Sequence, residues 1–319
     1  MQMRSVRDAD VGGKKVLLRV DFNVPMQGDQ VTDDTRITAA VPTIKLLLER
    51  GAHVILLTHL GRPDGKVVEE LRTAPLMAKL SEYVQGDIEM LENLRFDPRE
   101  EANDPAFAKE LASKGDIFVN DAFAVSHRAH ASTVGITQFL PSYAGLLMEK
   151  EVEHLSHALT PPAGAVAIMA VTKIDKIPLV NKLATLYGKV LVGGPVPADF
   201  VPAVPNIEAP TDGIPQREGL LDIGPATREK YIAEVSRAPF ILWNGPLGWY
   251  EKGYTQSTDA IANKIIETGV QAVIGGGDTI HALEKFSFDP QKVFLSTGGG
   301  AMLEFLAQGT LPGIEPLKQ

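Results

Sequence analysis

Short apolar runs that stop at polar or glycine-rich turns recur along this 319-residue chain, and a helical pattern follows most of them. The runs at 16–20 and 53–58 show this clearly, because an amphipathic stretch around 37–50 lies between them and ends at Gly51. Strand, helix and strand in alternation are typical of parallel sheets, in which each helix carries the chain back across the sheet. The pattern therefore predicts an α/β fold.

Two glycine turns stand between an apolar run and a helical pattern, at 274–279 and 296–301. Glycine lets the backbone approach a ligand closely, and free N–H groups at a helix start attract anions. One such turn could equally be an ordinary connection, but two in succession favour phosphate binding. Neither turn fits the Walker pattern or G-x-G-x-x-G, so the sequence supports neither a P-loop nor a dinucleotide fingerprint.

Composition narrows the class of protein further. The net charge of −9 and a pI near 5.3 argue against a nucleic-acid surface, although a local basic pocket could still hold a small anion. The absence of cysteine excludes disulfides and thiol nucleophiles. No apolar run reaches spanning length, and the first residues lack the apolar core of a signal peptide. We expect a cytoplasmic protein with no membrane partner.

Polar residues follow the first two predicted strands directly. Asp21 and Asn23 come after the first, and His59 and Arg62 come after the second. Because ligands bind at the carboxyl ends of parallel strands, these four side chains are expected to converge.

Four arginines occur at strand ends or in the loops that follow: Arg36, Arg62, Arg95 and Arg128. A single arginine is more often solvated or ion-paired. Four in such positions favour a pocket for phosphate or carboxylate, which the guanidinium binds bidentately. The histidines nearby could suggest a metal, but no spacing typical of metal ligands supports one.

A run of proline and glycine at 161–164 predicts a domain boundary, after which a second α/β series begins. The proline-rich stretch at 195–215 shows no clear period, so we expect mostly loop there. The prediction is a first lobe over 1–160 and a second over 161–310.

These segments together resemble the phosphoglycerate kinase family over most of the chain. The matching motifs, in order, are RVDFNVP at 19–25, DTRI at 34–37, HLGRP at 59–63, ENLRF at 92–96, NDAF at 120–123, HRAHAST at 127–133, LDIGP at 221–225, WNGP at 243–246, GGGD at 275–278 and STGGGA at 296–301. The resemblance implies two Rossmann-like lobes joined by a hinge. The first would bind 3-phosphoglycerate or 1,3-bisphosphoglycerate, with residues 311–319 packing back on it, and the second would bind ATP or ADP with Mg²⁺.

The resemblance also implies roles for individual residues. The phosphoglycerate pocket would consist of Asp21, Asn23, Arg36, His59, Arg62, Arg95 and Arg128. The nucleotide would contact Lys173, Lys176, Asn244, Glu251, Gly276, Gly277, Asp278 and Thr279, with Asp278 at the magnesium. The catalytic set would be Lys173, Arg36, Gly298 and Gly299. We expect an active kinase that works as a monomer.

The chain departs from the family pattern at several points. It is shorter between Val84 and Ile88 and again after Phe200, so the enzyme is predicted to be a compact form. The family's glycines before the lysine are replaced by Ala170-Val171-Thr172, and one residue is missing between Lys173 and Asp175. A lost residue rotates the following helix start by about a third of a turn, which affects Lys176 more than Lys173. The family's arginine before this strand aligns with Ala163.

Three hypotheses are compatible with this sequence. The first is an active, compact phosphoglycerate kinase. The second is a non-catalytic paralogue that binds phosphoglycerate or nucleotide as a regulatory protein, which the altered 171–176 turn supports. The third keeps the phosphotransferase class but changes the acceptor, and the intact arginine set disfavours it.

Overall fold

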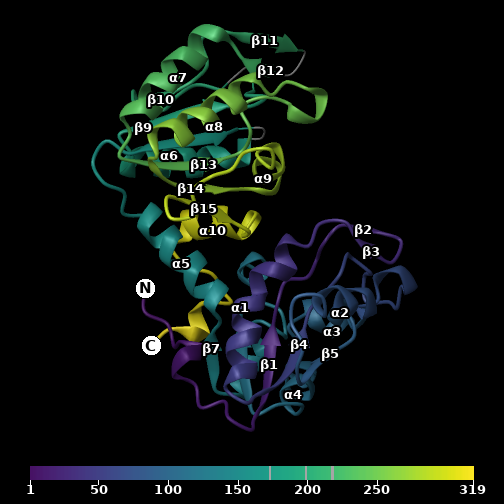
Figure 1. The fold of residues 1–319 in the computed structure, drawn as a ribbon. Coiled ribbons are helices and arrows are strands. Elements are labelled where there is room, and N and C mark those ends of the chain that lie inside the picture. The colour runs from purple at the N-terminus through teal and green to yellow at the C-terminus, as the bar shows by residue number, and fades with distance from the viewer. Residues whose placement is uncertain (172–173, 198–199, 217–218) are drawn as a thin grey trace. The chain divides into compact units, whose positions relative to one another are not determined.

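The computed structural model describes residues 1–171, 174–197, 200–216 and 219–319 (Figure 1). It has two units, each organised around one parallel sheet, so the predicted α/β class with parallel sheets is confirmed. The first unit contains Met1–Glu153 and Thr310–Gln319, and the second contains His154–Gly309. No helix in the described part of the chain combines the length and the apolar character that crossing a membrane requires.

The sheet of the first unit has the strand order β5-β4-β1-β6-β7, and all its pairings are parallel. The central strand β1 is buried on both faces, with Val16 and Leu18 in one apolar cluster and Leu17 in another. Burial on both faces explains why residues 16–18 of this strand form a continuous apolar run instead of alternating. The strands are β1 (Lys15–Arg19), β4 (His53–Leu57), β5 (Ile88–Met90), β6 (Ile117–Asn120) and β7 (Ser142–Ala144).

Helices cover both faces of this sheet, and a small hairpin of β2 (Met26–Gln27) and β3 (Gln30–Val31) precedes the first of them. The α-helices are α1 (Thr35–Glu49), α2 (Ala74–Leu80), α3 (Pro98–Glu101), α4 (Pro105–Ala112) and α5 (Leu146–Ala158). The 3₁₀-helices are η1 (Val6–Asp8), η2 (Glu69–Leu71), η3 (Leu94–Phe96), η4 (Phe123–Val125), η5 (Gly135–Gln138) and η8 (Glu315–Leu317).

The last ten residues belong to the first unit. The Arg4 N–H donates to the Leu317 carbonyl at 2.8 Å, and the Gly313 N–H donates to the Ser126 carbonyl at 2.8 Å. The Asn120 side chain, at the end of β6, also donates to the Gly313 carbonyl at 3.2 Å. These bonds fix the C-terminus beside the carboxyl end of the sheet.

The sheet of the second unit has the order β10-β9-β8-β13-β14-β15, again entirely parallel. Trp243 is fully buried at its centre. The strands are β8 (Val166–Ala170), β9 (Lys189–Gly193), β10 (Ile207–Glu208), β13 (Phe240–Asn244), β14 (Gln271–Gly275) and β15 (Val293–Ser296), with a separate antiparallel pair of β11 (Gly213–Gln216) and β12 (Gly219–Ile223). The helices are η6 (Ile174–Lys176), α6 (Ile177–Leu186), α7 (Pro225–Arg237), η7 (Tyr250–Lys252), α8 (Gln256–Thr268), α9 (Gly277–Ala282) and α10 (Gly300–Gln308).

The division between the units falls within α5, whereas the sequence predicted a boundary at 160. The reason is that the end of α5 packs on elements of the second unit. His154 stacks on Phe294 with ring centroids 4.1 Å apart, and the Tyr187 hydroxyl donates to the Ala158 carbonyl at 2.6 Å.

Two segments have local structure that the sequence analysis did not specify. Residues 94–96 form the 3₁₀-helix η3, because the Asn93 side chain accepts from the Arg95 N–H and thereby caps a helical turn. The stretch at 195–215 is mostly loop but contains β10 and the start of β11. Pro215 fits in β11 because the register of this short hairpin shifts between Ile214 and Pro215.

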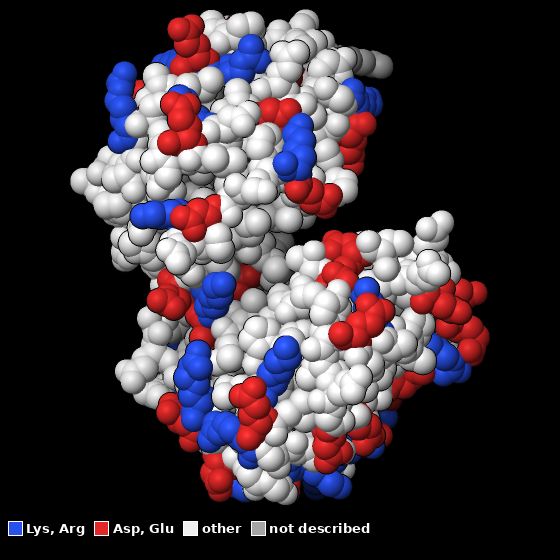
Figure 2. Space-filling model, viewed as in Figure 1, with Lys and Arg blue, Asp and Glu red and all other residues white. Residues whose placement is uncertain are grey.

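Acidic and basic side chains are interspersed on the face of each unit that Figure 2 shows. Many of them pair locally, as Lys79 does with Glu82 at 2.7 Å. Such exposed pairs add little to stability.

Candidate functional sites

Each sheet reverses its strand order at one point. In the first unit the chain passes from β1 to β4 and β5 on one side and returns to β6 and β7 on the other. In the second unit β8 is followed by β9 and β10 on one side, and β13 to β15 lie on the other. Ligands of open α/β sheets bind outside the carboxyl ends of the strands at such a reversal.

The loop after β1 forms the centre of the first site. The Arg36 guanidinium donates to the Asp21 carboxylate at 2.8 Å and to the Asn23 carbonyl at 3.1 Å. The Asn23 side-chain oxygen accepts from the Gly61 N–H at 2.8 Å. The structure thus brings Asp21, Asn23 and Arg36 together and ties them to the loop that carries His59.

The remaining arginines of the first site are placed differently. Arg95 donates to the Gly61 carbonyl at 2.9 Å and lies 3.1 Å from the Glu101 carboxylate, which is 4.0 Å from Arg128. Arg62 is exposed and has no hydrogen bond or ion pair with any residue that the structure describes. The structure therefore brings Arg95 and Arg128 to one carboxylate, a contact that Arg62 does not share.

A buried chain of hydrogen bonds behind this site was not predicted. The Arg19 Nε–H donates to Ser132 Oγ at 2.8 Å, and the Ser132 hydroxyl donates to Glu100 Oε1 at 2.5 Å. All three side chains are buried. In the sequence, Glu100 follows Asp97 by three residues, which is the spacing of a solvent-facing capping box at a helix start. This spacing gave no reason to predict that Glu100 is buried.

His59 and His130 of the first site are neutral at pH 7. Burial, together with the nearby Arg19, lowers the pKa of His59 well below its usual value of 6.5. The same two causes lower the pKa of His130 to about 4. The positive charge of this site therefore comes from its arginines, which remain protonated at all relevant pH values.

The buried His130 predicts a pH dependence of stability. Its folded pKa of about 4 lies below the ordinary 6.5, so the unfolded chain binds more protons between these values. The contribution to the free energy of unfolding is complete above pH 6.5 and is lost as the pH falls toward 4. Urea unfolding at pH 7 and pH 5 should show a smaller acid-induced loss in His130→Gln than in the parent. An equal loss in both proteins would contradict this assignment.

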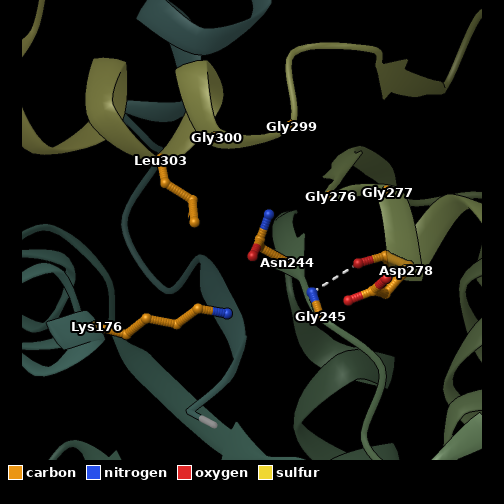
Figure 3. Close-up of a pocket in the computed structure, with 10 residues that line it drawn as sticks. Lys176, Asn244, Gly245, Gly276, Gly277, Asp278, Gly299, Gly300 and Leu303 are labelled. Carbon is orange, nitrogen blue, oxygen red and sulfur yellow. Dashed lines mark hydrogen bonds between the residues drawn. The ribbon is translucent and has the colours of Figure 1, made fainter. Parts of the chain in front are cut away.

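The second unit has a cavity of about 190 Å³ at the carboxyl ends of its strands (Figure 3). Gly276 forms part of its wall with φ at +102°, and a Cβ there would lie 2.9 Å from the Asn244 side-chain nitrogen. Only glycine combines this backbone geometry with so close an approach. The lining residues are Lys176, Asn244, Gly245, Gly276, Gly277, Asp278, Thr279, Gly299, Gly300 and Leu303.

Hydrogen bonds between strand ends hold this cavity in shape. Asn244 donates from its side chain to the Gly275 carbonyl at 2.9 Å. The Gly245 N–H donates to Thr279 Oγ1 at 2.7 Å, and Figure 3 marks this bond of Gly245 by a dashed line. Both predicted glycine turns are present, with α9 beginning at Gly277 and α10 at Gly300. Of the two glycines predicted to be catalytic, Gly299 lines the cavity, whereas Gly298 is buried and does not.

A second cavity of about 290 Å³ adjoins the first, since Lys176, Gly245 and Asp278 line both. Its other lining residues are largely apolar: Ala170, Pro195, Pro246, Gly248, Trp249, Tyr250 and Glu251. Glu251 accepts from the Trp249 indole N–H at 3.0 Å. Glu251 was predicted from the sequence, but its neighbours Trp249 and Tyr250 were not. The one feature that could have indicated them is their position shortly after the turn at Pro246.

Of the two lysines that were predicted to contact nucleotide, the structure describes Lys176. Lys176 lies at the end of η6, donates to the Ala170 carbonyl at 3.1 Å and points toward Asn244 and Gly245 (Figure 3). The missing residue in its turn therefore does not remove it from the cavity. Lys173 lies outside the described residues.

The residues around the first cavity of the second unit suit a magnesium ion that arrives with phosphate groups. Mg²⁺ is usually held by one or two carboxylates together with substrate phosphates and water. Asp278 supplies one carboxylate that borders both cavities. Within the described ranges no three His, Asp or Glu side chains cluster as a self-sufficient metal site. One carboxylate suits a cation that binds together with nucleotide phosphates better than a cation that the protein holds by itself.

The fold and these sites define an α/β protein with a cluster of arginines at the strand ends of one unit and a glycine-walled cavity in the other. The family model described as phosphoglycerate kinase matches residues 6–90, 82–208 and 195–309. A phosphoglycerate kinase of Roseiflexus sp. (strain RS-1) is 39% identical, and the alignment covers 99% of each chain. The chain belongs to the phosphoglycerate kinase family, as the motifs predicted.

Solved structures agree with this assignment. Phosphoglycerate kinase from Coxiella burnetii is 32% identical with a TM-score of 0.86, and the match covers 99% of this chain and 98% of that one. The Pyrococcus horikoshii OT3 enzyme is 27% identical with a TM-score of 0.82 and the same coverage. The Roseiflexus alignment runs over 392 positions, 73 more than this chain has residues.

Proposed function

We propose that this chain catalyses reversible phosphoryl transfer between 1,3-bisphosphoglycerate and ADP, giving 3-phosphoglycerate and ATP. The observation that carries the proposal is the pairing of two anion sites within one member of this family. One is the Asp21–Arg36 cluster at the β1/β6 reversal, and the other is the glycine-walled cavity at the β8/β13 reversal. Each lies where its sheet reverses strand order.

In the first unit, Arg36, Arg95 and Arg128 would bind the phosphate and carboxylate of phosphoglycerate through charge-assisted hydrogen bonds. Arg62, which is exposed and unpaired among the described residues, is available to the same ligand. Asp21 and Asn23 would bind the glycerate hydroxyl and orient Arg36. Glu101 holds Arg95 and Arg128 near one another before substrate arrives.

In the second unit, the nucleotide phosphates would bind to the N–H groups of Gly276, Gly277 and Gly299 and to Lys176 and Lys173. Asn244 and Thr279 would add polar contacts, and Glu251 would accept from the ribose. The second cavity, with Trp249 and Tyr250, would take the base. Asp278 would hold Mg²⁺, which when bound neutralises charge on the phosphates.

Acyl-phosphate transfer needs no covalent protein intermediate; it needs alignment of the reacting groups, neutralisation of charge and exclusion of water. The test of the proposal is a coupled assay with 3-phosphoglycerate and Mg-ATP. We expect turnover well above background. Binding of both ligands without turnover would support the non-catalytic paralogue instead.

Further attributes belong to the same proposal. The protein would be a compact monomer that acts in the cytoplasm, with no nucleic-acid or membrane partner. The net charge of −9 supports the absence of a nucleic-acid partner, since polyphosphate backbones repel an acidic surface.

Lys173 should act chiefly on the chemical step, because its ammonium would face the phosphoryl group while that group is transferred. Replacing Lys173 with Ala is expected to lower kcat by about a hundredfold or more. Lys176→Ala, whose parent side chain already donates to the Ala170 carbonyl, is the comparison variant and should lose less. Steady-state kinetics with both substrates varied separates the outcomes: an unchanged kcat with a raised KM for Lys173→Ala would contradict the assigned role.

Base recognition is expected to be weak. Apolar and aromatic side chains dominate the wall of the second cavity, and such surfaces stack on any purine without reading its edge. We therefore expect poor discrimination between ATP and GTP. The measurement is kcat/KM for both nucleotides at the same magnesium concentration. A preference for ATP above about a hundredfold would show that polar groups select the base.

A further inference from the structure

Arg19 stands at the last position of the central strand β1, with only 1% of its surface exposed. Its guanidinium is bonded in several directions: to Ser132 Oγ, to the Val20 carbonyl and to the Leu57 carbonyl. The remaining nitrogen, Nη2, lies 3.3 Å from Nδ1 of His59. Arginine has five N–H donors and no acceptor, so the direction of each of these bonds is known.

This direction determines where the proton of His59 lies. Because Arg19 can only donate, Nδ1 of His59 must accept, and the proton of the neutral ring must then be on Nε2. The Asp21 carboxylate, 3.9 Å from the same Nδ1, can only accept and favours the opposite tautomer. Arg19 is the nearer of the two and therefore prevails.

The other bonds of Arg19 keep it in place. Ser132 Oγ accepts from Arg19, so its single hydrogen goes to Glu100 Oε1, and the Ser132 N–H donates to Glu100 Oε2 at 3.0 Å. Glu100 is fully buried and supplies the nearby negative charge that a buried guanidinium needs. The charges of Arg19 and the other arginines around His59 also disfavour its protonated form.

We propose that Arg19 is a positioning residue of the first site, which holds His59 as the neutral Nε2–H tautomer and thus as a hydrogen-bond donor to substrate. Glu100 and Ser132 fix Arg19 in that role. The last step, donation to phosphoglycerate, rests on the proposed function. The tautomer itself is a property of the free protein and can be measured without any turnover.

The first test is ¹⁵N NMR of the histidine rings at pH 7, with the His59 signals assigned through His59→Gln. The expected result is a protonated Nε2 and an unprotonated Nδ1. A proton on Nδ1, or a charged ring, would overturn the proposal even if the protein is an active kinase. Conversely, the expected tautomer in a protein that fails to turn over would leave this inference standing and remove the proposed function.

The second test uses the double variant Arg19→Met/Glu100→Gln, which removes both buried charges together and so avoids leaving either unpaired. His59 should shift toward the Nδ1–H tautomer that Asp21 favours. KM for 3-phosphoglycerate should rise roughly tenfold, the loss expected for one hydrogen bond to a charged ligand. KM for nucleotide should not change. An unchanged tautomer in the folded variant would contradict the proposal.

The matched control is Arg50→Met. Arg50 is another arginine of the first unit that donates only to carbonyls, those of Val6, Arg7 and Ala9. Its replacement should lower the melting temperature while leaving the His59 tautomer and both KM values as in the parent. If Arg50→Met shifted the tautomer as the double variant does, the effect would reflect general loosening of the unit.

Discussion

Replacing Asp278 with Asn should lower kcat/KM for Mg-nucleotide by about a thousandfold, since a bound divalent cation supplies several kcal/mol of transition-state stabilisation. Among the residues that the structure describes, Asp278 is the one carboxylate that borders both cavities of the second unit, and it lies in the first turn of α9. Asn keeps the size of the side chain but is a much weaker ligand for a hard cation. The measurement is steady-state kinetics over a range of magnesium concentrations.

The control for Asp278→Asn is Asp289→Asn in the same unit, whose carboxylate accepts from the Gln291 N–H and lines neither cavity as described. It should leave both kcat and the magnesium dependence unchanged. If Asp278→Asn also kept the parental magnesium dependence, Asp278 would not be the ligand. A partial recovery of Asp278→Asn at high magnesium is part of the expected result.

The second large effect is expected from Arg36→Lys. Arg36 donates from one nitrogen to both Asp21 and the Asn23 carbonyl, which leaves the other end of its planar fork available to substrate. Lysine keeps the charge and can still pair with Asp21, but it cannot reproduce the fork. Arginines that stabilise a transferring phosphoryl group contribute about 10³-fold or more to kcat. We expect kcat/KM for 3-phosphoglycerate to fall by about that factor.

Arg72→Lys is the matched control, because Arg72 also forms a fork with carboxylates, those of Glu69 and Glu92, on the surface of the same unit. It should leave the kinetics unchanged. Calorimetric titration of 3-phosphoglycerate into both variants gives a second readout. Binding to Arg36→Lys at parental affinity would remove Arg36 from the pocket.

The sequence was sufficient for the features that follow from local pattern. Both sheets were predicted because their strands are continuous apolar runs, as in β1 and β4, and the residues after those strands, such as Asp21 and His59, converge as expected. The glycine turns were predicted because a positive φ, such as that of Gly276, favours glycine, and the glycines are visible in the sequence. The family motifs then predicted the substrates and the roles of individual residues.

What the sequence could not predict depends on contacts between distant segments. Glu100 and Ser132 are 32 positions apart, and neither has a neighbour in the chain that suggests a buried chain of hydrogen bonds to Arg19. Trp249 and Tyr250 follow a turn instead of a strand, so periodicity gave no reason to place them in a cavity wall. The second compact unit begins at His154, before the Pro-Gly punctuation, because contacts of His154 and Tyr187 tie the end of α5 to that unit.

The most direct test of the central claim is the identity of the product formed from γ-labelled ATP, Mg²⁺ and 3-phosphoglycerate. Transfer to the carboxyl group gives an acyl phosphate, which hydroxylamine cleaves rapidly, whereas a phosphate ester resists it. The account predicts a labelled product that is lost on hydroxylamine treatment and is not formed by Arg36→Lys or Asp278→Asn above trace levels. A hydroxylamine-resistant product, or label that stays in ATP throughout, would contradict it.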